Sequence, residues 1–266
     1  MSYRPRAATN GTDWSMTSRA RGASWPASAF LFALPLLAGD IGGPPSAEAI
    51  LDRYVAVTGG EAAYERIGNQ ITALTVTSGG QVVGHAVYTQ TRSGDFHAIE
   101  TVADRVTETG VSHGIAWTRA GESAKLLEAG EEHDRALRDA VLLWPGQWRK
   151  FYTDIAYETS ATVGGELCDS VTAIPFAGSQ ERLWFSRRTG LLMKQEVYEP
   201  EGQAEFTFDD YMDVGGVRIA RKQSARAGNT VFLLTLDSVE FNRTLPASTF
   251  RLPEEIVRLL KKKAAE

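Results

Sequence analysis

The sequence predicts a protein of the α+β class, mostly β, built on a single curved antiparallel sheet of about eleven strands. The first supporting observation is that turn glycines recur every 12 or 13 residues through the second half of the chain. Such an interval holds one strand and a tight turn, whereas a crossover between parallel strands by itself needs about a dozen residues. The second is that only about three segments show helical periodicity. The spaced glycines are Gly165, Gly178, Gly190, Gly202, Gly215 and Gly228.

The composition is that of a globular, acidic chain for which no nucleic-acid partner is expected. Of the 266 residues, 43% are apolar and 23% are charged, which excludes wholesale disorder. The formal net charge of −5 makes the chain a poor candidate for binding a phosphate backbone. Cys168 is the single cysteine, so an internal disulfide, a four-cysteine zinc site and a CxxC redox centre are excluded.

The first 45 residues differ from the rest and predict export. Arginines within the first 21 residues precede an apolar run over residues 27–38, which is the order of a secretory signal. The run is too short to span a membrane comfortably, and Pro35 interrupts it. We predict a cleavable signal peptide and disordered leader over 1–45, with Met16 a more usual start; an uncleaved anchor and a plain disordered tail are the alternatives. No cysteine directly follows the run, so no lipid anchor is expected.

The remainder, residues 46–266, is predicted to be one domain that begins with a helix over Ser46–Thr58. Apolar residues recur there at i, i+1, i+4 and i+5 from Ile50, which places them on one face. Ser46 is a suitable N-cap, and the glycine pair 59–60 ends the helix. A short second turn is expected over Glu61–Ile67.

After this helix the apolar pattern changes to a period of two, which predicts strands. Glycine pairs and Ser-Gly or His-Gly pairs separate these strands, so each one runs antiparallel to its neighbour. With the glycine-spaced strands of the second half, the count is eleven or twelve. The strands expected before them are Gln70–Ser78, Gln81–Thr91, Asp95–Ala103, Arg105–Val111, Ile115–Arg119 and Phe151–Ala161.

Two further helices are expected to cover one face of the sheet. The segment Glu131–Trp144 carries an apolar stripe and ends before Pro145, which cannot continue a helix. The last helix has Pro253 at its first position, acids in its first turn and lysines 261–263 at its end, a charge order that suits the helix dipole. A twisted sheet of this size curls. We therefore predict an open half-barrel, rather than a closed barrel, with helix 131–144 across its concave face.

The sequence contains no spacing that predicts catalysis, a metal site or a cofactor. A nucleophile elbow, a P-loop and a dinucleotide fingerprint are all missing, and the histidines lack metal-ligand spacing. If a hairpin turns near residues 92–93, His85 falls roughly opposite Glu100 on the same face, which we interpret as a structural or solvent-facing pair. The expected function is accordingly non-catalytic.

Large aromatic residues are numerous for a chain of this kind. The first interpretation of them is an ordinary core; the sharper one is an apolar cavity lined by rings, into which acyl chains fit. The candidate ligand-binding residues are Trp117, Trp144, Trp148, Phe151, Trp184, Phe206, Phe208 and Phe232.

Five further segments are considered together for their order and spacing: Ala49–Gly60, His113–Trp117, Leu183–Leu192, Asp209–Arg218 and Ser248–Pro253. In this order and spacing they resemble bacterial outer-membrane lipoprotein-sorting-like proteins, the LolA-like family. The resemblance implies a half-barrel of about eleven antiparallel strands with helices in its mouth, a periplasmic location, and an apolar cavity that holds acyl chains. The chain departs from the family's lipid-anchored branch, because it has no lipobox cysteine.

The leading hypothesis is therefore an exported, non-catalytic carrier that binds acyl chains of lipid or lipoprotein, with a role in lipoprotein sorting and outer-membrane biogenesis. The alternative is a periplasmic interaction or sensor module of an envelope complex, with a membrane-protein partner and no lipid transfer. A third possibility is a hydrolase whose catalytic residues would form a histidine cluster with serine or aspartate at the cavity mouth.

Overall fold

In the computed structural model, residues 43–199, 202–228 and 230–265 are described. These residues form one compact unit. The predicted signal peptide lies almost entirely outside the described residues. Within the described part of the chain, no helix has the length and apolar character needed to cross a membrane.

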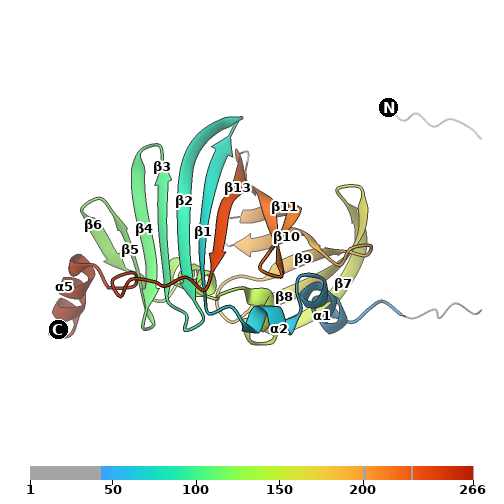
Figure 1. Cartoon of the computed structure of the whole chain (residues 1–266), viewed down its shortest axis with the longest axis horizontal. Helices are drawn as coiled ribbons and strands as arrows, with labels where there is room; N and C mark the ends of the chain where they lie inside the picture. Colours follow the sequence, from blue (N-terminus) through green and yellow to red (C-terminus); the bar gives the residue numbers. More distant parts are fainter. Residues whose placement is uncertain (1–42, 200–201, 229, 266) are drawn as a thin grey trace, which may run out of the picture. The chain divides into compact units, whose positions relative to one another are not determined.

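The unit is built on one antiparallel sheet, which remains open as predicted (Figure 1). Its thirteen strands lie in the order β6-β5-β4-β3-β2-β1-β13-β12-β11-β10-β9-β8-β7, so every neighbouring pair is consecutive in the chain except β1 and β13. The strands are β1 Asn69–Ser78, β2 Gln81–Thr91, β3 Phe96–Val102, β4 Arg105–Ser112, β5 Ile115–Ala120, β6 Ser123–Leu126, β7 Tyr152–Val163, β8 Glu166–Pro175, β9 Glu181–Ser186, β10 Leu192–Glu199, β11 Gly202–Val214, β12 Val217–Ala227 and β13 Thr230–Phe241.

The sheet is larger than the predicted eleven strands. The strand that the sequence pattern missed is β6, which has four residues and pairs with β5. Four residues are too few for an alternation of period two to stand out from the neighbouring loop. The other strands agree with the expected segments to within a few residues.

The first helix, α1 (Ala47–Val57), begins and ends where the sequence predicts. The Ser46 side chain accepts a hydrogen bond from the backbone N–H of Ala49 at 3.2 Å, which caps the first turn. At the other end, the backbone N–H of Gly60 donates to the carbonyl oxygen of Val55 at 2.8 Å. The expected second turn is α2 (Glu61–Glu65).

The connection from β6 to β7 does not form the predicted continuous helix over 131–144. Helix α3 (Glu131–Asp139) ends early and is followed by a 3-10 turn, η1 (Trp144–Gln147), and by α4 (Trp148–Phe151). Ala140 and Leu142 are both buried, but they pack into different core clusters. In a continuous helix, residues two apart point to opposite sides, so one of the two would point away from the concave face, where both clusters lie. The helix therefore ends before Leu142, and Leu143 adopts a left-handed backbone with φ of 48°.

The last helix, α5 (Glu254–Lys263), packs beside β6 at one edge of the sheet. Pro253 is its N-cap, in an extended conformation, and not its first helical residue as predicted. The acidic first turn and basic last turn agree with the expected dipole complementarity.

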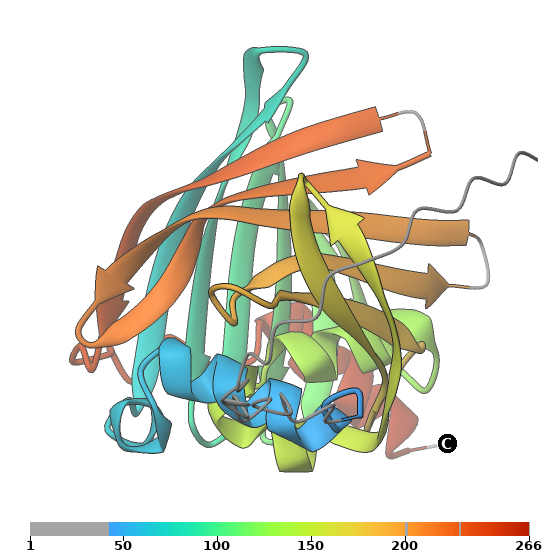
Figure 2. The ribbon, with the colours of Figure 1, turned by 90° about the vertical axis from the view of Figure 1, so that its right-hand side faces the viewer.

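Two core clusters lie on the concave face of the sheet, where the helices gather beneath the strands (Figure 2). The larger cluster packs α1, α2, η1 and α4 against strands that include β8, β9 and β10. The smaller packs Ala136 and Ala140, at α3, against β3, β4 and β5. The curved antiparallel half-barrel with helices on its concave face is thus confirmed.

Candidate functional site

The concave face carries apolar side chains that neither core cluster includes. In β13, Leu236 pairs with Leu74 of β1, which is buried, and Leu234 pairs with Val76. Since side chains of one strand alternate between faces, Phe232 lies on the same face as Leu234 and Leu236. On the other side of β13, Phe232 pairs with Ala225 of β12.

Phe206 of β11 extends the same row, because it also pairs with Ala225. These side chains are only partly buried, whereas concave-face residues beneath the helices, such as Leu183 and Phe185, are almost fully buried. The helices therefore leave part of the concave face uncovered. We define this uncovered set as the apolar stretch; its members are Val76, Phe206, Phe232, Leu234 and Leu236.

Four of the predicted ligand-binding aromatics pack with the larger core cluster instead. Trp148 and Phe151 are buried in it, and Trp144 and Phe208 pack against it. The ring of Trp144 lies 5.9 Å from that of Tyr54 on α1 and 5.8 Å from that of Phe151, measured between centroids. These rings fill the concave face beneath the helices.

Trp117 and Trp184 lie on the opposite, convex face. Their neighbours Ala116 and Leu183 belong to the concave core clusters, and adjacent strand residues point to opposite faces. Trp117 packs 5.8 Å from the ring of His97 and against Gly110, where a Cβ atom would lie 2.6 Å from the indole. The size of an aromatic residue does not indicate its face, because a shift of one residue moves a side chain to the other face of the sheet.

The predicted juxtaposition of His85 with Glu100 is also wrong by one residue. Glu100 pairs with Ala86, and His85 pairs with Thr101, so the two side chains point to opposite faces. The hairpin is centred on residue 93, whereas the expected pairing centres it between residues 92 and 93. Glu100 instead accepts a hydrogen bond from the Tyr88 hydroxyl at 2.8 Å. Among the described residues, no group of three or more His, Cys, Asp or Glu side chains could hold a metal ion.

A buried polar cluster next to the apolar stretch was not predicted. Glu181 at the start of β9 accepts hydrogen bonds from the Tyr152 hydroxyl at 3.1 Å and from Gln195 Nε2 at 2.8 Å. Its other oxygen lies 3.7 Å from Nη1 of Arg138, which comes from α3. Gln195 is directly opposite Phe206 in the sheet, so the cluster borders the apolar stretch.

The electrostatics of this cluster are those of a buried ion pair. The side chains of Arg138 and Glu181 are 11% and 4% exposed. Burial raises the pKa of the Glu181 carboxyl, and the Arg138 guanidinium opposes that rise. Nη1 of Arg138 has no hydrogen-bond partner. Gly178 lies against the guanidinium, and a Cβ atom there would come within 2.7 Å of it.

Helix α3 also forms a hydrogen bond with β2, which is distant from β9 in the sheet. Gln90 of β2 donates from Nε2 to the backbone oxygen of Asp139 at 2.5 Å. Because Arg138 reaches β9 and Asp139 contacts β2, α3 connects strands that are distant in the sheet order. It therefore spans the concave face, as predicted for the helix at this position.

The carboxyl of Asp139 gives a testable pH dependence. The residue is reached by water, but the surrounding protein removes part of the hydration of the carboxyl and raises its pKa to about 6, against the opposing effect of Arg138 and Arg135. Ionisation is then harder in the folded than in the unfolded chain, where the pKa is about 4. The contribution of the neutral Asp139 carboxyl to the free energy of unfolding is fully present below about pH 4, and it is lost as the pH rises through about 6.

We expect Asp139→Asn to remove this loss. At about pH 8 the variant should melt about 2 °C above the wild type. This corresponds to a gain of about 1 kcal/mol in the free energy of unfolding, after allowance for solvent screening of an exposed group. At about pH 4 the variant and the wild type should melt together. Circular dichroism melts across this range provide the measurement, and a variant less stable at the higher pH would contradict the expectation.

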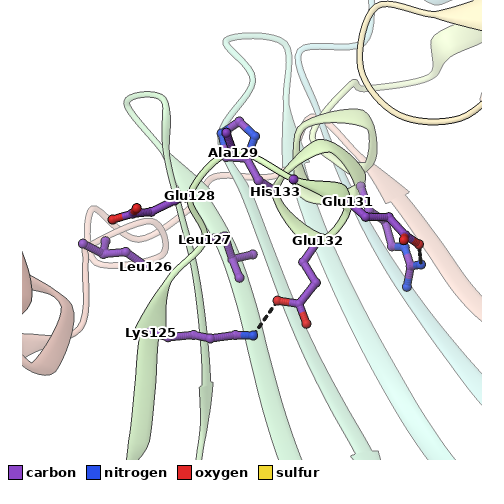
Figure 3. Close-up of a pocket in the computed structure, with 10 residues that line it drawn as sticks. Lys125, Leu126, Leu127, Glu128, Ala129, Glu131, Glu132 and His133 are labelled. Carbon is purple, nitrogen blue, oxygen red and sulfur yellow. Dashed lines mark hydrogen bonds and ion pairs between the residues drawn. The ribbon is translucent and has the colours of Figure 1, made fainter. Parts of the chain in front are cut away.

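A polar pocket of about 450 Å³ lies where β6 leads into α3 (Figure 3). Two ion pairs lie within its lining. Lys125 contacts Glu132 at 2.5 Å, and Arg135 contacts Glu131 at 3.0 Å. Such a lining does not match an acyl chain, so the apolar stretch remains the candidate site. The pocket is lined by residues 125–133 and 135.

The sheet, its helical cover and the apolar stretch define an open antiparallel half-barrel of the LolA-like fold. No protein-family model and no curated protein matches the sequence. Solved structures do match, at sequence identities that demonstrate the fold alone. The resemblance predicted from the sequence is therefore confirmed for the fold.

Three solved structures illustrate the match. A DUF1329 family protein from Desulfovibrio piger aligns with 77% of this chain and 97% of its own, at a TM-score of 0.54 and 12% identity. A domain assigned to outer membrane lipoprotein sorting, from Vibrio parahaemolyticus, aligns with 79% of this chain and 97% of its own, at a TM-score of 0.52 and 12% identity. A LolA superfamily protein from Nitrosomonas europaea aligns with 79% of this chain and 99% of its own, at a TM-score of 0.53 and 11% identity.

Proposed function

We propose that the protein is an exported, non-catalytic carrier that binds acyl chains of lipid or lipoprotein on the apolar stretch. The observation that carries this proposal is the partial exposure of Phe206, Phe232 and Leu234 on a concave face that the helices otherwise cover. Burial of an acyl chain against them contributes about 0.8 kcal/mol per methylene group. An affinity in the micromolar range then needs about ten buried methylene groups.

The packing of the concave face supports this location. Under α1, η1 and α4 the sheet is filled by the protein's own rings, including Trp144 and Phe151. The acyl chain is therefore assigned to strands β11, β13 and β1, beside the polar cluster around Glu181. The lipoprotein-sorting domain among the similar structures supports a carrier role, and the apolar run at residues 27–38 supports export to the periplasm.

Native mass spectrometry of protein purified from its own periplasmic fraction tests the carrier function. We expect acylated species to co-purify, and a fluorescent fatty acid to bind the delipidated protein with saturation. The proposal fails if neither is observed. Recovery of a stable envelope protein without lipid would favour the alternative, an interaction or sensor module.

A charge on the apolar stretch should weaken binding of the acyl chain. We expect Phe232→Glu to weaken fatty-acid binding by more than about tenfold, because the carboxylate must lose water where the acyl chain lies. Leu233→Glu is the matched control, since this neighbouring residue of β13 points to the convex face and is 39% exposed. It should bind as the wild type does. Equal effects of the two substitutions would argue against binding on the concave face.

A further inference from the structure

Exposed apolar side chains concentrate at one rim of the sheet. Of the ten large apolar side chains that are exposed among the described residues, five lie at the ends of neighbouring strands from β13 to β4. The hairpins β1–β2 and β3–β4 end side by side at this rim, at the top of Figure 1. We call this set the rim patch; its members are Val82, Val102, Val106, Val231 and Leu233.

The convex side of the rim presents a row of these residues. Leu233 of β13 and Val82 of β2 both pair with Thr77 of β1, so they lie on one face of the sheet. Val231 is two residues from Leu233 and shares that face. Val82 is 59% exposed, which is the largest value among them. With neighbouring strands about 4.8 Å apart, the five strands from β13 to β4 spread the patch over about 20 Å.

The concave side of the same rim is apolar too. Leu234, Val76, Gly84 and Val102 follow one another in register across β13, β1, β2 and β3. Gly84 lets Val102 approach closely, because a Cβ atom at Gly84 would lie 3.1 Å from the Val102 side chain. Leu234 and Val76 belong to the apolar stretch. Apolar surface therefore runs without interruption from the rim to the candidate site.

This two-sided arrangement discriminates between possible partners. A protein surface laid against the sheet would cover one face and leave the other in water. A lipid bilayer surrounds an inserted edge and contacts both faces. Exposed arginines lie at the border of the patch, each beside an acid: Arg105 follows Asp104 of the β3–β4 turn, and Arg226 is in register with Val231 on one side and with Glu205 on the other. Guanidinium groups at the border of an apolar patch complement lipid phosphates.

We propose that the rim patch docks into the surface of a phospholipid bilayer. The valines and Leu233 enter the interfacial region, and Arg105 and Arg226 contact headgroups. An acyl chain then passes along the row from Val102 to Leu234 and reaches the apolar stretch without crossing water. This inference rests on the proposed carrier function, but its test is independent of fatty-acid binding.

Co-sedimentation with vesicles of phosphatidylethanolamine and phosphatidylglycerol tests the docking. We expect the wild type to sediment with vesicles, and the variant Val82→Ser, Val106→Ser, Leu233→Ser to bind them at least about tenfold more weakly. Fatty-acid binding in solution should be unchanged in this variant. The control is Val87→Ser with Ile99→Ser, which removes two residues of equal exposure, 39% each, from the middle of β2 and of β3. It should bind vesicles within about twofold of the wild type.

Several outcomes would overturn the inference. They are a wild type that does not bind vesicles, a rim variant that binds as tightly as the wild type, and a control that loses as much as the rim variant. A dimer in solution that the rim substitutions dissociate, without any effect on vesicle binding, would assign the patch to self-association instead. A wild type that binds fatty acid but not vesicles refutes the docking alone. One with rim-dependent vesicle binding and no fatty-acid binding refutes the carrier function alone.

Discussion

Replacement of Glu181 by leucine is expected to lower the free energy of unfolding by about 3–5 kcal/mol, because it removes the carboxylate that pairs with the buried Arg138 guanidinium. The side chain of Arg138 is 11% exposed, and Glu181 is the carboxylate paired with it. The substitution also removes the acceptor for the hydroxyl of Tyr152 and for Gln195 Nε2. Urea denaturation followed by tryptophan fluorescence measures the change.

Two controls separate the charge effect from general damage. The double variant Glu181→Leu, Arg138→Leu should recover most of the lost stability, since removing both members of a buried pair is often nearly neutral. Glu240→Leu breaks the exposed pair with Arg243 and should cost less than about 1 kcal/mol. If Glu181→Leu costs no more than Glu240→Leu, the pair does not hold α3 to β9.

Replacement of Trp117 by alanine is expected to cost about 3–5 kcal/mol and to leave fatty-acid binding unchanged. The indole is 4% exposed and packs against Gly110 and His97 on the convex face. Its loss creates a cavity far from the apolar stretch. Denaturation measures the first effect, and titration with a fluorescent fatty acid at a temperature where the variant is folded measures the second.

This prediction distinguishes the two faces of the sheet. Phe232→Glu should weaken binding without a comparable loss of stability, because Phe232 is partly exposed. Trp117→Ala should do the reverse. A loss of fatty-acid binding in Trp117→Ala would mean that the convex face contributes to the site. Aromatic content would then indicate the binding residues better than the face of the sheet on which they lie.

The fold was predictable because its signals are local. A turn glycine, an N-cap serine and a helix stop each depend on the conformation of a few neighbouring residues, as Ser46 and Gly60 show. The site was predictable only in part. Phe206 and Phe232 lie on the uncovered concave surface, whereas Trp117 and Trp184 do not. Assigning faces requires the register of every strand, and a bulge such as that between Val76 and Thr77 changes it.

By itself, the sequence determined an antiparallel meander, the start and end of its first helix and the acidic, single-cysteine character of the chain. Tertiary structure alone decided that β1 pairs with β13, that Arg138 meets Glu181 across the concave face, and that Leu234, Val76 and Val102 form one row. The physical reason is sequence distance. Turn and cap preferences act within a few residues, whereas these contacts join segments whose approach depends on the curvature of the whole sheet.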